Sequence, residues 1–164
     1  MRLSLLVSRD FAVLVQAVRS LPAEVSKQYR AAARRVLEPA FKSEMTERAE
    51  THLQQRVIVD TARVSIRDDN AILRSATIGK IGDGVPASVL AGGAEFGNDP
   101  NRTVVSRSRK GKEYKRRMGG VFRRPQRGGY VFFPAVQAFI PRAGALLWQT
   151  AYRTVAETFE KVSK

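Results

Sequence analysis

The sequence predicts an α+β fold, in which long N-terminal helices and a C-terminal amphipathic helix pack on a small antiparallel sheet. Three observations lead to this prediction. Apolar residues recur at helical spacing near both ends of the chain, strand-like alternation occurs in the middle, and a strongly basic segment follows it. The length of 164 residues suits a single domain over 1–164, since a domain usually takes roughly 100–200 residues.

Helices are expected to fill the first third of the chain. In residues 9–20 the apolar side chains share one helical face, and a second pattern starts at Pro22. The apolar stripe of that second pattern is Val25, Tyr29, Ala32, Ala33, Val36, Phe41, Met45, Ala49 and Leu53. Because an interior proline removes one backbone hydrogen bond, we expect a kink or a break at Pro39. Residues 22–53 would then form one long bent helix or two abutting helices.

The middle of the chain changes to the period of a strand. Residues 61–67 alternate polar and apolar side chains, residues 68–70 have turn chemistry, and residues 72–78 are expected to form the return strand. Residues 86–96 follow a glycine-rich stretch and contain two central glycines of their own. Both a short helix and a strand remain open there.

Most of the net charge of +14 is concentrated in one segment. Residues 101–129 hold eleven Lys or Arg against a single acidic residue, Glu113, whereas residues 1–97 hold 14 basic and 11 acidic residues. A structureless loop of this length is unusual in a compact domain. We therefore expect residues 98–129 to form a basic loop or an extended hairpin arm inserted within the domain. Its strands would lie at residues 104–105 and 121–122, with residues 106–120 at the tip.

The C-terminal segment has the clearest helical pattern. Its apolar residues step by four and three positions, as expected of one continuous stripe: Trp148, Tyr152, Val155, Phe159 and Val162. Pro134 and Pro141 are expected to mark boundaries, so that the long helix begins near residue 141.

Little in the sequence points to an enzyme or to a cofactor. The chain has no cysteine and one histidine, His52, which excludes thiol chemistry and leaves no basis for a histidine-rich metal site. No phosphate-binding loop, dinucleotide fingerprint or nucleophile-elbow motif is present. Asp68 and Asp69 suit a turn better than a catalytic pair. We expect no catalytic residue, no cofactor and no metal, and neither a signal peptide nor a membrane-spanning run.

The basic segment has three interpretations from composition alone. It is a solvated surface, a site for nucleic acid, or a surface that docks on an acidic protein. Nucleic-acid binding would use the cations on phosphates and would allow Tyr114 and Phe122 to stack on bases.

The order of three signals resembles the tail-completion or head–tail joining (neck) proteins of long-tailed bacteriophages. The first signal is Glu95-Phe96-Gly97, the second is an aromatic stretch that closes in Pro134-Ala135, and the third is the final amphipathic helix. In that family the Glu-Phe-Gly sequence ends a sheet segment, and the Pro-Ala opens the last helix. The basic segment between the two motifs is longer here than the family's usual link, and Val131 stands where the family tends to have phenylalanine.

The resemblance implies a structural protein without chemistry of its own. Such proteins form a ring, commonly sixfold, between the DNA-filled head and the tail tube. The expected partners are further copies of the chain, other neck and tail-tube proteins and DNA in the lumen, and the expected location is the virion neck, with host cytoplasm during assembly. The residues expected to make assembly or DNA contacts are Arg107, Arg109, Lys110, Lys112, Lys115, Arg116, Arg117, Arg123, Arg124 and Arg127.

Two alternatives come from other functional classes. The stronger is a small basic nucleic-acid-binding protein that uses the 101–129 arm. A toxin-type nuclease has a suitable size and charge but lacks a convincing acid–base pair.

Overall fold

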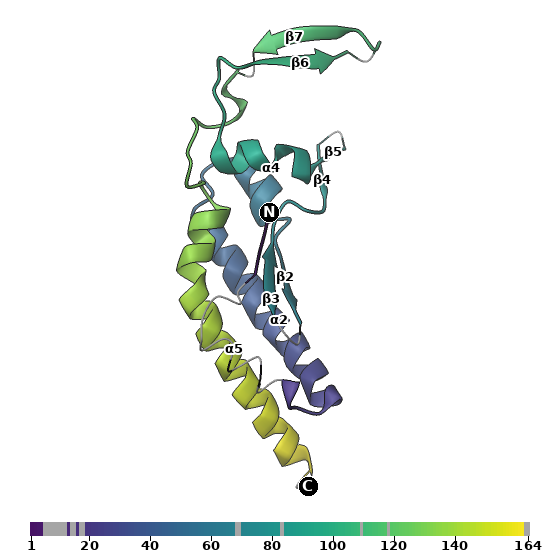
Figure 1. Cartoon of the computed structure of the whole chain (residues 1–164), viewed down its shortest axis with the longest axis vertical. Helices are drawn as coiled ribbons and strands as arrows, with labels where there is room; N and C mark the ends of the chain where they lie inside the picture. The colour runs from purple at the N-terminus through teal and green to yellow at the C-terminus, as the bar shows by residue number, and fades with distance from the viewer. Residues whose placement is uncertain are drawn as a thin grey trace.

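The expected α+β class is confirmed. The computed structural model describes residues 1–4, 13, 16, 19–67, 70–82, 84–108, 110–117 and 119–162. Helix α2 (Ala23–Thr46) lies between the long helix α5 (Phe132–Val162) and a small antiparallel sheet (Figure 1). Most of the helix expected at residues 9–20 lies outside the described residues, as do Asp68 and Asp69.

Helix α2 continues through Pro39, so of the kink or break expected there, the break was wrong. Pro39 is exposed, whereas Leu37 and Phe41 on either side of it are fully buried. Burial of such side chains contributes about 1.5–3 kcal/mol each, which offsets the hydrogen bond that the proline removes. The core position next to Pro39 is Leu37 rather than the expected Val36, which is 42% exposed.

The break in the first helical region occurs after Thr46, where a new helix is capped. The Thr51 hydroxyl accepts a hydrogen bond from the Gln54 N–H, and the Gln54 side chain accepts one from the Thr51 N–H. This reciprocal capping box starts α3 (His52–Gln54), which continues into a π-helical turn at Gln55–Val59. His52 is exposed at the start of α3.

The three-stranded sheet has the order β1-β3-β2. Its strands are β1 (Arg2–Ser4), β2 (Arg63–Ile66) and β3 (Ala71–Arg74), and every pairing is antiparallel. The predicted hairpin in the middle of the chain is thereby confirmed, although its second strand ends earlier than expected. The small strands β4 (Lys80–Ile81) and β5 (Val85–Pro86) pair next, and α4 (Ala87–Phe96) settles the open alternative at residues 86–96 as a helix.

The core of the molecule lies on both sides of α2, where this helix packs on α5 and, through Val64 and Leu73, on the sheet. The Phe41 ring is 6.0 Å from the ring of Phe132 and 5.3 Å from that of Phe139, measured between centroids. Farther along α5, the buried positions are Ala143, Leu147 and Ala151. The small alanine side chains allow the two helices to approach closely along this length.

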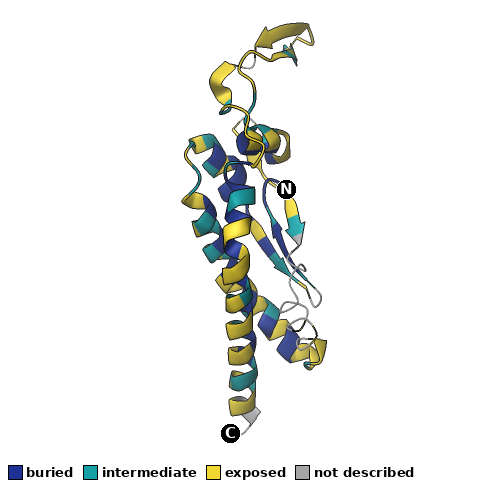
Figure 2. Ribbon diagram, turned by 60° about the vertical axis from the view of Figure 1, so that its left-hand side comes forward, coloured by how far each residue is buried: buried dark blue, intermediate teal, exposed yellow. Residues whose placement is uncertain are grey.

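Two expectations for α5 were wrong. The helix begins at Phe132, not near residue 141, and both Pro134 and Pro141 lie within it. The predicted apolar stripe is also not the core face, because Trp148, Tyr152 and Phe159 are 42%, 81% and 72% exposed. Figure 2 shows the exposed surface that extends along the C-terminal half of this helix.

Candidate functional site

The basic segment forms a two-stranded antiparallel hairpin that lies beyond α4, at the end of the molecule opposite the C-terminus (Figure 1). Strand β6 (Thr103–Arg107) pairs with β7 (Glu113–Arg117), and residues 108–112 connect them. The expectation that Val121 and Phe122 would form the second strand was wrong. The charged residues from Glu113 to Arg117 form it instead, and we call residues 103–117 the basic ribbon.

The basic ribbon carries cations on both of its faces. Because alternate residues of a strand point to opposite faces, the pairings Val105↔Lys115 and Thr103↔Arg117 lie on one face. Arg116 lies on the other face, opposite Val104. All of β7 is exposed, and Lys110 and Lys112 are exposed in the connecting turn. Arg109 lies outside the described residues.

Two side-chain contacts cross the ribbon. Arg107 Nη2 lies 2.7 Å from Glu113 Oε1, so an arginine neutralises the ribbon's one carboxylate. Arg116 Nε donates a hydrogen bond to Ser106 Oγ at 2.9 Å. Within the described part of the chain, no carboxylate lies within 4.0 Å of the cationic nitrogens of the remaining ribbon cations, Lys110, Lys112, Lys115 and Arg117.

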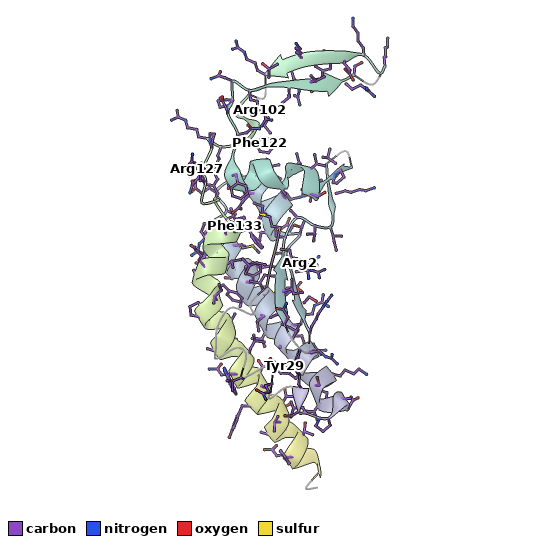
Figure 3. All side chains as sticks on the ribbon, viewed as in Figure 1. Arg2, Tyr29, Arg102, Phe122, Arg127 and Phe133 are labelled. Atoms are coloured by element: carbon purple, nitrogen blue, oxygen red, sulfur yellow. The ribbon has the colours of Figure 1, made fainter. Side chains whose placement is uncertain are left out.

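Backbone hydrogen bonds fasten both ends of the hairpin to the C-terminal end of α4. The Asn98 N–H donates to the Arg123 carbonyl at 2.8 Å, and the Gln126 N–H donates to the Phe96 carbonyl at 2.8 Å. The ring of Phe122 covers Gly93, where an added Cβ would lie 2.5 Å from the ring. Figure 3 shows Phe122 and Arg127 between the ribbon and the start of α5. A larger residue at position 93 would displace the linker from α4.

The three predicted contact residues that follow the ribbon have separate environments. Arg123 lies 4.2 Å above the ring of Tyr130, and its Nη1 is 2.8 Å from the Glu50 carboxylate. The Arg124 carbonyl accepts a hydrogen bond from the Tyr130 hydroxyl at 2.8 Å. Arg127 is exposed and lines a shallow pocket beside Phe96. Arg123 therefore stabilises the base of the arm, while the ribbon cations project into solvent.

The residues of the two matched motifs come together under the arm. The Glu95 carboxylate is fully buried and accepts hydrogen bonds from three backbone N–H groups at the start of α5. The donor-to-oxygen distances are 3.2 Å from Val131, 2.8 Å from Phe132 and 3.0 Å from Phe133. Glu95 thus caps the positive end of the α5 dipole across 36 or more residues of sequence.

Pro134 completes this cap. The first N–H groups of a helix have no partner within the helix, and a proline in the first turn has no N–H to satisfy. The next residue, Ala135, already donates to the Val131 carbonyl at 3.0 Å and is fully buried. Every backbone N–H from residue 131 to 135 is thereby hydrogen-bonded, and Pro134 has none to satisfy.

The end of α4 depends on Gly97. Its φ of 72° is in the left-handed region, which favours glycine, and an added Cβ would collide with the Arg124 carbonyl. The motif ends a helix here, so the expectation that it would end a sheet segment was wrong. Phe96 packs on Phe133, with their ring centroids 5.5 Å apart.

The described residues contain no group of three or more His, Cys, Asp or Glu that could hold a metal ion. In the same part of the chain, none of the helices has the length and apolar character needed to span a bilayer. No protein-family model, curated protein or solved structure matches this chain.

Proposed function

We propose that this chain is a structural protein of the phage head–tail interface, which forms a ring between the DNA-filled head and the tail. It would act without catalysis, reside in the virion neck, and pass through the host cytoplasm during assembly. Its partners would be further copies of itself, in sixfold arrangement, and the neck and tail-tube proteins above and below. The residues that resemble the family carry the proposal.

The observation that carries this proposal is the meeting of the two motifs. Glu95 and Gly97 come from one motif, and Pro134 and Ala135 from the other, with the whole basic segment between them. In the fold they form one unit, in which the first motif caps the helix that the second one opens.

Two exposed surfaces also suit a ring subunit. A closed ring requires head-to-tail contacts, in which two different surfaces of each subunit meet. One surface is the apolar stripe of α5 at Trp148, Tyr152 and Phe159, since exposed apolar patches commonly mark interaction sites. The basic ribbon also suits a ring subunit, because it extends away from the helices and can reach DNA in the lumen of the ring (Figure 1).

A small nucleic-acid-binding protein is the second candidate. The observation in its favour is that the ribbon's unpaired cations are exposed within the 101–129 arm. On this alternative the chain would bind nucleic acid as its main activity, and particle assembly would proceed without it.

Complementation of a phage that lacks this gene product tests the neck proposal. The phage would carry an early nonsense codon, and a plasmid would supply the wild-type chain or a variant with serine at positions 112, 115, 116 and 117. We expect the wild type to restore plaques and the variant to reduce the plaque titre strongly. A matched control replaces four exposed cations of the body with serine: Lys27, Arg35, Lys80 and Arg142. Plaques at normal titre without any plasmid would contradict the proposal.

A further inference from the structure

The basic ribbon has the charge of a nucleic-acid surface rather than that of a protein interface. Residues 103–117 contain seven Lys or Arg and one carboxylate, Glu113, which Arg107 neutralises. Protein interfaces usually have an apolar centre in which charged residues are depleted. The ribbon's exposed apolar side chains, Val105 and Tyr114, lie on opposite faces, so neither face has such a centre.

The distribution of aromatic residues distinguishes double from single strands. Proteins that bind single strands stack successive bases on several aromatic side chains. The ribbon has one aromatic residue, Tyr114. Single-strand binding would therefore lack its main source of affinity beyond charge.

The geometry of the ribbon fits a duplex. A major groove about 12 Å wide admits a two-stranded ribbon and is bordered by phosphates on both sides. Lys115 and Arg117 project from one face, Arg116 projects from the other, and Lys110 and Lys112 lie in the turn. A ribbon with cations on both faces can contact both rows of phosphates at once. A flat surface with cations on one side reaches only one row.

We propose that the basic ribbon binds duplex DNA through its phosphates, independently of base sequence. The inference deepens the neck proposal, on which it rests for the source of the duplex, namely the packaged genome. The two-stranded ribbon also gains from such a partner, since an isolated hairpin is marginally stable in water. The bound phosphates would hold together the cations of its two faces.

The test measures binding of the purified full chain to a fluorescent duplex of about three helical turns, ~30 bp. Fluorescence anisotropy is recorded over a range of salt concentrations. The ribbon variant carries glutamine at positions 110, 112, 115 and 117, which leaves the cross-strand contacts of Arg107 and Arg116 in place. The matched control carries glutamine at positions 27, 35, 80 and 142, all exposed cations of the body. Both variants therefore have the same net charge.

Each phosphate contact contributes about 0.9 to the slope of log affinity against log salt, so the ribbon variant should lower that slope by roughly 3 to 4. Its affinity at about 0.15 M salt should fall between tenfold and ~10³-fold, whereas the control should stay within a few-fold of wild type. Equal losses in the two variants would show that net charge alone governs binding and would overturn the proposal. Tighter binding to a single strand of the same length would also overturn it.

A charge-conserving variant separates loss of charge from damage to the hairpin. In this variant arginine replaces Lys110, Lys112 and Lys115, and lysine replaces Arg117. The exchange keeps every positive charge, so the salt slope should stay near that of the wild type, although Arg and Lys differ in how they hydrogen-bond a phosphate. A fall in slope as large as that of the glutamine variant would contradict binding through phosphates. A failure in these assays leaves the neck proposal standing, because that proposal is tested on particles. Normal particles without the protein would leave the DNA-binding result unchanged.

Discussion

Replacement of Glu95 should destabilise the protein more than the same replacement of an exposed glutamate. The carboxylate is 0% exposed and accepts hydrogen bonds from the N–H groups of Val131, Phe132 and Phe133. Glu95→Ala would leave these donors buried without an acceptor. A buried donor left without an acceptor typically costs about 1–3 kcal/mol, so with three such donors we expect the free energy of unfolding to fall by at least about 3 kcal/mol.

Glu95→Gln should have an intermediate effect. The amide keeps one acceptor oxygen but directs an NH₂ group toward backbone donors, and it removes the negative charge from the helix N-terminus. Hydrogen bonds to charged groups contribute about 1.5–3 kcal/mol, so we expect a loss in that range. This smaller loss keeps the variant measurable if Glu95→Ala does not fold.

Urea denaturation followed by circular dichroism would measure both losses. The control is Glu157→Gln, which breaks an exposed ion pair with Arg153 and should change the free energy of unfolding by less than about 0.5 kcal/mol. If Glu95→Gln proved as stable as that control, the carboxylate would not be the cap of α5. The first motif would then not stabilise the helix that the second motif opens.

Three further substitutions test other parts of the fold. Gly97→Ala should lower the free energy of unfolding by about 1–3 kcal/mol, because it adds a Cβ at a φ of 72° against a carbonyl; an unchanged Tm would contradict this. Burial raises the pKa of Tyr29 from 10.0 to about 12, so stability should fall as the pH rises from 10 toward 12, and Tyr29→Phe should remove that part of the loss in denaturation at alkaline pH. An equal alkaline loss in both proteins would argue against a buried Tyr29. Burial alone would raise the pKa of Glu38, but a backbone N–H of β2 and cations of α2 lower it below 4.5. The stability that Glu38 supplies is therefore present above pH 4.5 and is lost as the pH falls through the lowered pKa. Glu38→Gln should reduce this loss of stability at acid pH. If the free energy of unfolding of the variant fell with pH as in the wild type, these contacts would not be the cause.

Much of the fold followed from hydrophobic periodicity. The pattern at Val25, Tyr29 and Phe41 correctly predicted the buried face of α2, and the alternation at residues 61–67 correctly predicted β2. These patterns succeed because each element buries one side, which the spacing of its apolar residues records.

The prolines were misleading because local rules do not include tertiary contacts. Pro39 stays within α2 because buried neighbours hold the helix on both sides. Pro134 opens α5 rather than preceding it, because a distant carboxylate satisfies the donors before it. A contact between Glu95 and residues 131–133 leaves no periodic signal in the sequence.

The buried face of the last helix was not predictable for a different reason, since two faces of that helix carry apolar residues. The stripe that the sequence pattern identifies has the largest side chains, including the exposed Trp148 and Tyr152. The real core face has Ala143, Leu147 and Ala151, whose small size lets α2 approach. Side-chain volume misled here because close helix packing favours small residues.

The charge of the candidate site could be predicted from the sequence, but its secondary structure could not. The excess of Lys and Arg correctly located an exposed basic segment. The sequence did not reveal that Lys115, Arg116 and Arg117 lie in a strand, since charged residues rarely nucleate one. It also did not separate Arg123, which stacks on Tyr130, from the exposed cations of the ribbon.

Electron microscopy of a lysate tests the neck proposal most directly. The phage that encodes this chain would carry an early nonsense codon in its gene and would grow in a host without a suppressor. The proposal predicts full, DNA-containing heads and complete tails that lie apart, because the ring that joins them is missing. Normal, joined and infectious virions in that lysate would contradict it.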